Sequence, residues 1–187
     1  MHMELTAIGM IETSSIASGI MAEDAMLKAA EVQLLIARTI CSGKFIVIVG
    51  GSVGAVRASV DAGIYAIGEL LIDDLVIPNV HPAVFQALGQ SIVLEPDQAD
   101  ALGILETFSA ASIIEAADAA AKAASVILFR LHVAMAVGGK GFLFLTGDVA
   151  AAHAAVAAGA ARASERGMLV NKIVIPRPRA ELFNEYI

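Results

Sequence analysis

The sequence predicts an α/β protein of the α+β kind, with two consecutive domains that each follow the split βαβ, or ferredoxin-like, order. Two repeats carry this prediction. The segment AIGMIET at residues 7–13 returns as ALGILET at residues 101–107, and DAMLKAA at 24–30 returns as DAAAKAA at 118–124. Both pairs lie 94 positions apart. A period near a hundred residues matches one ordinary domain per copy rather than a short solenoid repeat.

The two copies stay in phase to their ends. Gly51-Ser52-Val53 matches Gly147-Asp148-Val149 at a spacing of 96, and Val76-Ile77-Pro78 matches Val174-Ile175-Pro176 at 98. The slow increase predicts short loop insertions in the second copy. The polar, proline-containing segment 81–100 indicates the connection, so we place the boundary near Ile92 and predict domains at 1–92 and 93–187.

Each predicted strand is an apolar run bounded by polar or glycine residues, and each predicted helix has apolar residues at spacings of three and four. The strands are 5–11, 32–39, 45–49 and 71–77, then 101–105, 126–134, 142–145 and 169–175. The helices are 17–29 and 53–66, then 112–123 and 149–162. The last strand of each copy stops at a proline, which cannot donate to a ladder. The order β-α-β-β-α-β is that of the split βαβ plan.

Composition limits the partners of the chain. Of its 187 residues 58% are hydrophobic, only 17% are charged and none is tryptophan. A surface so poor in charge tends to be covered by a partner, so we expect an oligomer. The net charge of −7, with no run of Lys or Arg, argues against nucleic acid as a partner.

No membrane partner is expected either. The longest stretch without charge, residues 75–94, is interrupted by Pro78, Pro82 and Gln86, whereas a spanning helix needs about 20 mostly apolar residues. The start MHME lacks the basic and apolar regions of an export signal. We therefore expect a cytoplasmic location.

The chain shows no pattern typical of an enzyme, such as paired acids or a nucleophile beside a base. Glu12 and Glu106 recur at the same place in both copies, which favours structural acceptors for loop amides. The glycines around Ser52 lack the ending of a phosphate-binding loop. The histidines have no metal-ligand spacing. We expect a protein that is not an enzyme.

Cys41 is the only cysteine. A lone cysteine is usually a small buried hydrophobe, but Cys41 precedes Ser42-Gly43-Lys44, a turn-like stretch that favours exposure. The second copy has Met135 or Ala136 at this place. One thiolate cannot hold an iron–sulfur cluster. A closed ring of three identical chains would bring three copies of Cys41 to one axis.

Through these residues the chain resembles the bacterial microcompartment shell proteins, specifically their tandem-domain trimers. The match rests on residues 7–13 and 24–30, the glycine loops around Gly43 and Gly139, and the segments 147–149 and 174–178. It runs through both copies. The loop TICSGKF at 39–45 and the ending IPRP at 175–178 look most like the propanediol-utilisation branch.

The resemblance implies a homotrimeric pseudohexamer that tiles with other shell proteins in the shell of a cytoplasmic microcompartment. It also implies one [4Fe-4S] cluster per trimer, with Cys41 as the metal ligand from each chain, for electron transfer or cluster delivery to enclosed redox enzymes. Lys28, Lys122 and Arg177 match tile-edge positions, and the first copy has Asn79 in place of the arginine. The residues expected to line the central pore are Ser42, Gly43, Lys44, Val137, Gly138 and Gly139.

Two alternatives stay open from the residues. The first is a pore without a cluster, in which the two glycine loops and Lys140 conduct small polar metabolites. The second is a trimeric ferredoxin-like protein that senses a small ligand between subunits. Against the second stands the absence of a convergent polar constellation in the sequence.

Overall fold

The computed structural model describes residues 4–89, 92, 94 and 100–184. The chain divides into two compact units, Met1–Val80 and His81–Ile187. This division falls between Val80 and His81, whereas the sequence predicts the domain boundary near Ile92. The expected cytoplasmic location rests partly on residues 1–3, which lie outside the described residues. Pro96 of the predicted connection lies outside them too. None of the described helices combines the length and hydropathy that crossing a membrane requires.

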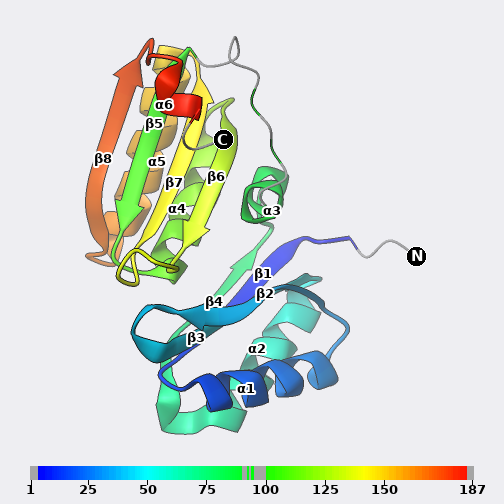
Figure 1. Ribbon diagram of the computed structural model, residues 1–187. Coiled ribbons are helices and arrows are strands. Elements are labelled where there is room, and N and C mark those ends of the chain that lie inside the picture. Colours follow the sequence, from blue (N-terminus) through cyan, green and yellow to red (C-terminus); the bar gives the residue numbers. More distant parts are fainter. Residues whose placement is uncertain (1–3, 90–91, 93, 95–99, 185–187) are drawn as a thin grey trace. The chain divides into compact units, whose positions relative to one another are not determined.

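The first unit has the predicted order of elements (Figure 1). Its elements are β1 Ala7–Thr13, α1 Ile16–Ala29, β2 Gln33–Ile40, the 3-10 turn η1 Cys41–Gly43, β3 Lys44–Gly51, α2 Val53–Ile67, η2 Gly68–Leu70 and β4 Leu71–Pro78. The strands form one antiparallel sheet in the order β2-β3-β1-β4. Both long helices cover the same face of this sheet, as the split βαβ plan predicts.

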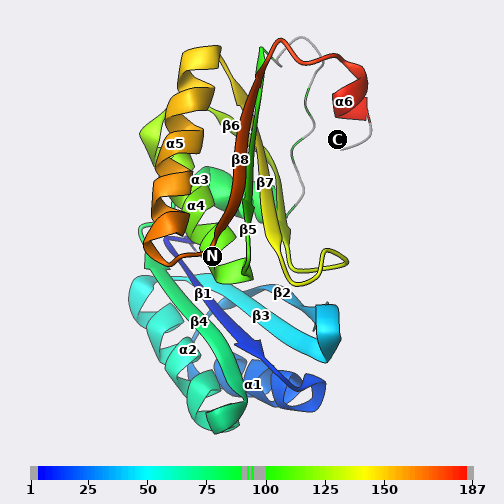
Figure 2. The same cartoon turned by 90° about the vertical axis from the view of Figure 1, so that its left-hand side faces the viewer.

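The second unit repeats this architecture after an additional helix. Its elements are α3 Pro82–Leu88, β5 Ala101–Thr107, α4 Ala110–Ala123, β6 Ile127–Val133, β7 Gly141–Gly147, α5 Val149–Glu165, β8 Leu169–Pro176 and α6 Glu181–Asn184. The sheet order is β6-β7-β5-β8, again antiparallel. Figure 2 shows α6 on the side of this sheet opposite α5. The predicted fold class is confirmed.

Each long helix begins at a side chain that caps it. Ser15, Ser52, Ser109 and Asp148 accept a hydrogen bond from the backbone N–H three residues further on. The cap satisfies one of the N–H groups that has no partner within the helix. Ser52, in the glycine-rich stretch that could have bound phosphate, is therefore the N-cap of α2.

The core of the first unit follows the alternation of its central strands. Ile11 on β1 and Val47 on β3 point to the helix side, where they pack with Met26 of α1 and Val60 of α2. Glu12 and Ile46 come next along the two strands and are paired across the ladder. They lie on the opposite face because the side chains of a strand alternate.

The sequence predicts the connection between the domains at residues 81–100 and does not predict the helix α3 within it. His81 caps α3, its ring accepting from Ala83 N–H, and Pro82 occupies the first turn, where a missing N–H costs nothing. The helix packs against β6 and α4. Val84 and Ala87 are fully buried. A helix this short shows too little periodicity to be predicted from spacing alone.

Candidate functional site

Cys41 lies in η1, between β2 and β3, and is half-buried. The two following residues turn the chain with positive φ, 66° at Ser42 and 73° at Gly43. Glycine adopts this conformation without cost, whereas serine does so at some strain. On β2, burial lowers the pKa of Arg38 below its ordinary value. The turn at Ser42 and Gly43 places the Cys41 thiol at the end of the hairpin formed by β2 and β3.

The loop between β6 and β7 is the counterpart of this turn. Ala134, Ala136, Gly138 and Gly139 have φ values of 58°, 61°, 68° and 83°. Ala134 N–H donates to the Lys140 carbonyl at 3.0 Å, which closes the base of the loop. Val137, Gly138 and Gly139, the residues we expected at a pore, form its tip. This loop carries no cysteine, so the duplicated scaffold presents one thiol per chain.

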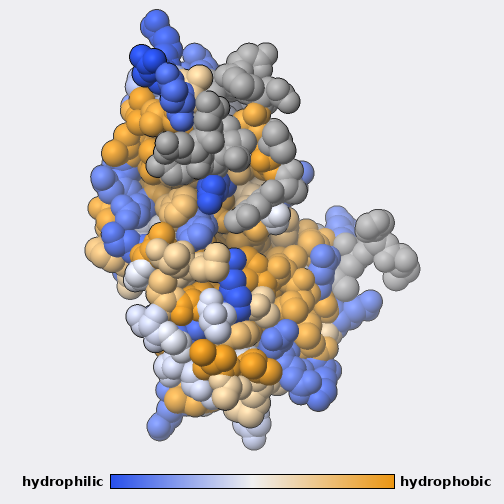
Figure 3. Space-filling view, in the orientation of Figure 1, coloured by the Kyte–Doolittle hydropathy of each residue, from blue (hydrophilic) through white to orange (hydrophobic). Residues whose placement is uncertain are grey.

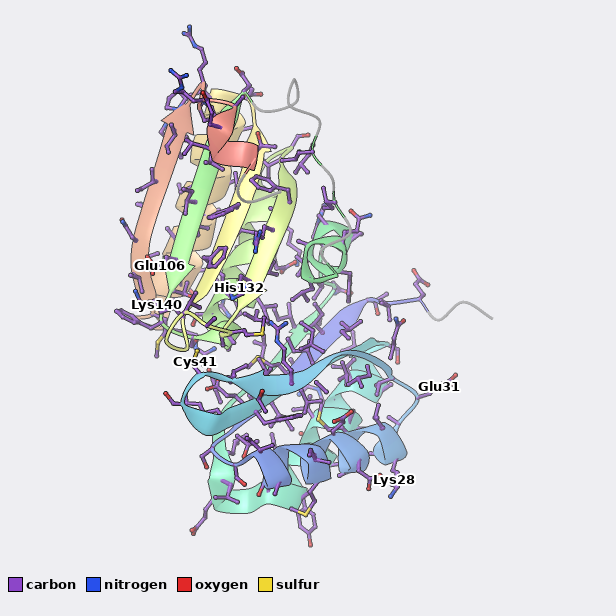
Figure 4. The ribbon with its side chains drawn as sticks, viewed as in Figure 1. Lys28, Glu31, Cys41, Glu106, His132 and Lys140 are labelled. Carbon is purple, nitrogen blue, oxygen red and sulfur yellow. The ribbon has the colours of Figure 1, made fainter. Side chains whose placement is uncertain are left out.

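An ion pair lies beside each of these loops, between a lysine at the end of the loop or the start of the next strand and a glutamate on the central strand. Lys44 Nζ donates to Glu12 Oε1 at 2.8 Å. Lys140 Nζ donates to Glu106 Oε1 at 2.8 Å, and Figure 4 labels these two residues. The two glutamates are structural acceptors as predicted, but their partners are lysine ammonium groups rather than loop amides. Both residue types recur at matching places in the sequence, and that repetition could have indicated the pairs.

The two pairs differ in burial, which predicts different effects on stability. The Glu12 side chain is 5% exposed and Glu106 is 34% exposed. We expect Lys44→Ala to reduce the free energy of unfolding by about 2 kcal/mol, since it leaves a buried carboxylate unpaired. Lys140→Ala should cost less than about 1 kcal/mol because water screens that pair.

Urea unfolding of both variants at one protein concentration measures this difference. Each variant is the matched control of the other, because the two pairs share their chemistry and length. Equal losses of stability would contradict the assigned role of burial.

The residues matching tile-edge positions lie at the ends of elements. Lys28, near the end of α1, pairs with Asp24 at 2.6 Å, and Lys122, near the end of α4, pairs with Asp118 at 2.6 Å. Figure 4 shows Lys28 at the surface of its unit. Arg177 is exposed and has a φ of 44°, and its N–H donates to the Asp100 carbonyl.

The described residues contain no cluster of three or more His, Cys, Asp or Glu side chains that could hold a metal ion. His132 stacks on Phe142, and its Nε2–H donates to the Met135 carbonyl at 2.5 Å. A metal centre of the iron–sulfur kind therefore needs thiolates from several chains. Cysteine thiolate is the right donor for such a centre, so the chemistry of Cys41 fits.

Comparison with known proteins identifies the two units. The model of the BMC domain family matches residues 7–80 and 101–178. The chain belongs to the BMC domain family. Both matches coincide with the four-stranded units described above, so this is a tandem BMC domain protein.

Some of its relatives match the whole chain and others match about half of it. The bacterial microcompartment shell protein PduT of Citrobacter freundii is 44% identical over 181 residues, covering 97% of each chain. The bacterial microcompartment shell protein PduA of Salmonella typhimurium is 43% identical over 93 residues, covering 48% of this chain and 98% of PduA. About half of this BMC domain protein thus matches 98% of PduA, which agrees with the duplication.

Solved structures agree with the fold. A crystal structure of a microcompartments protein from Desulfitobacterium hafniense DCB is 50% identical, with a TM-score of 0.92, and the match covers 97% of this chain and 99% of that one. The fused permuted hexameric shell protein MSM0275 from the RMM microcompartment is 24% identical, with a TM-score of 0.61 over 86% and 82% of the two chains. The second likeness concerns the fold alone.

Proposed function

We propose that this protein is a structural tile in the shell of a cytoplasmic bacterial microcompartment, in which three chains close into a ring of six BMC domains. The observation that carries the proposal is the pair of BMC domains together with 44% identity to the shell protein PduT over 97% of the chain. The role is structural rather than catalytic. Other shell proteins are the expected partners in the layer.

The surface of the first unit supports association. Ile16, Ile20, Met21 and Leu27 on α1 are between 40% and 56% exposed. Figure 3 shows apolar side chains at the surface over this helix. Apolar area of this kind marks an interaction site on a protein so poor in charge. A neighbouring chain in the ring would cover it.

The ring gives Cys41 its function in this proposal. Three chains supply three Cys41 thiolates, which would hold one [4Fe-4S] cluster at the pore, with Ser42, Gly43 and Lys44 and the loop 137–139 around it. Such a cluster, when bound, exchanges single electrons. Cys41 is half-buried in this loop, so part of the residue is exposed. Electron transfer across the shell or cluster delivery to enclosed redox enzymes would both use this position.

The exposed lysines at the ends of α1 and α4 are proposed to join neighbouring tiles. Each is held by a carboxylate one helical turn earlier, which fixes the direction of a long side chain. We expect Lys28→Ala and Lys122→Ala to abolish extended layers seen by electron microscopy while the mass of the ring stays unchanged.

Arg57→Ala is the control and should keep the layers. This substitution also removes an exposed cation, but from α2. Intact layers in both lysine variants would contradict the edge assignment. Because Arg177 has Asn79 as its counterpart, the two kinds of tile edge should also differ in strength.

The whole proposal is tested by native mass spectrometry and electron microscopy of the purified protein. We expect a mass of three chains and flat layers with hexagonal packing, alone or together with a single-domain shell protein. A single-chain mass, or discrete particles under all conditions, would contradict a tile.

A further inference from the structure

We propose that the C-terminal helix α6 of one chain packs on α1 and β2 of the next chain in the ring, where the backbone N–H of Arg179 donates to Asp24. The inference rests on the proposed ring and adds the contact that closes it. It follows from the way α3, the counterpart of α6 in the first copy, is used within the chain.

Helix α3 shows what the segment after the last strand of a copy does. It begins four residues after β4 ends at Pro78, and it packs on β6 and α4 of the second unit. The backbone N–H of His81, the N-cap of α3, donates to Asp118 Oδ1 at 2.8 Å. Val84 of α3 is fully buried. The first copy therefore uses its final helix to cover a second BMC domain.

The duplication relates residues of the α3 segment to residues of the α6 segment. At the spacing of 98 that relates Pro78 to Pro176, His81 corresponds to Arg179 and Val84 to Leu182. Leu182 is 40% exposed, in contrast to Val84. Arg179 bonds to Glu181, two residues away, and Leu182 N–H donates to the Arg179 carbonyl. Thus an apolar residue that is buried in α3 has a solvent-exposed counterpart in α6.

The surface that α3 covers also has an exposed counterpart. At the spacing of 94, Asp118 corresponds to Asp24, and their side chains are 11% and 61% exposed. Both pair with a lysine four residues later through Oδ2. Only Asp118 also accepts a backbone N–H through Oδ1 in the described part of the chain. Asp24 has the same Oδ1 acceptor, and a backbone N–H from a segment like the one at His81 would satisfy it.

Apolar positions around these aspartates show the same contrast. Ile114 on α4 is fully buried, whereas Ile20 at the matching place on α1 is 56% exposed. Leu128 on β6 is fully buried, whereas Leu34 on β2 is 38% exposed. The first copy thus presents an apolar surface of the kind against which α3 packs in the second copy.

In the proposed ring the second unit of one chain is followed by the first unit of the next chain, so the contact would form between chains. Residue 179 of each chain would meet residue 24 of the next, so the contact is heterologous, and three such contacts close. The occupant is fixed by the duplication: it is the segment after β8 of a second copy.

Thiol cross-linking tests the contact. In a Cys41→Ser background, Arg179→Cys and Asp24→Cys are combined in one chain and treated with a short bis-maleimide. We expect a covalently linked trimer on a denaturing gel. Each single variant alone should stay at the mass of one chain, and co-assembly of the two single variants should give linked dimers, as a heterologous contact requires.

Native mass spectrometry of the same samples separates the possible failures. A three-chain assembly that yields no link, or a link only within one chain, overturns this inference and leaves the tile proposal intact. A single-chain mass overturns both. As a second variant, Leu182→Asp changes an exposed residue and should raise the concentration at which the ring dissociates at least about tenfold, because a charge is then buried at the contact. An unchanged dissociation would also overturn the inference.

Discussion

Replacing Cys41 with serine is expected to remove all bound iron from the anaerobically purified protein while the ring of three chains persists. Cys41 is the only thiol of the chain, and oxygen of a serine hydroxyl is a poor substitute for the thiolates that hold iron–sulfur clusters. The unsubstituted protein should be brown and contain about four irons per trimer. Iron and sulfide analysis, the visible absorption spectrum and native mass together check the result.

Ser42→Ala is the matched control, since it alters the next residue of the same loop and leaves the thiol. It should keep the colour and the iron. Protein with Cys41 that stays colourless and iron-free after anaerobic reconstitution would contradict the cluster, and the trimeric tile would then stand without it.

Gly159→Ala is expected to destabilise the second unit strongly, by about 2 kcal/mol net. Gly159 lies in α5 where the helix approaches α4 and β5. A Cβ there would come within 2.5 Å of Leu105 Cδ1 and 2.8 Å of the Ala116 carbonyl oxygen. A backbone carbonyl in a packed helix cannot move aside cheaply. The overpacking therefore exceeds the gain of about 1 kcal/mol that alanine normally brings to a helix interior.

Gly54→Ala is the control for this substitution. Gly54 lies in the first turn of α2, where a Cβ would meet nothing within 4 Å. This variant should be neutral or more stable by roughly 0.5–1 kcal/mol. Thermal and urea unfolding at a single protein concentration compare the two variants. A Gly159→Ala protein as stable as the unsubstituted one would contradict the expected clash, because α4 and α5 would then move apart at little cost.

Much of the fold was predictable because it depends on neighbours in the sequence. The apolar alternation of residues 7–13 produces β1, and Ser15 starts α1 at the place where spacings of three and four begin. Helix α3 was not predicted because it is short and begins at a proline. The division into compact units falls before α3, which groups with the second unit, whereas the predicted boundary near Ile92 follows this helix.

The candidate site was predictable in part. The thiol of Cys41 and the turn at Gly43 follow from residue types alone. The pair between Glu12 and Lys44 does not, because its members lie 32 positions apart and meet only when β1 and β3 become neighbours.

The sequence by itself determined the duplication, the order of strands and helices in both copies and the single thiol in the first loop. Only the tertiary structure decided that equivalent residues differ, with Ile20 and Asp24 exposed where Ile114 and Asp118 are buried. Local structure depends on residues a few positions away, which the two copies share. Burial depends on which distant segment packs above a residue, and similar segments can have different neighbours.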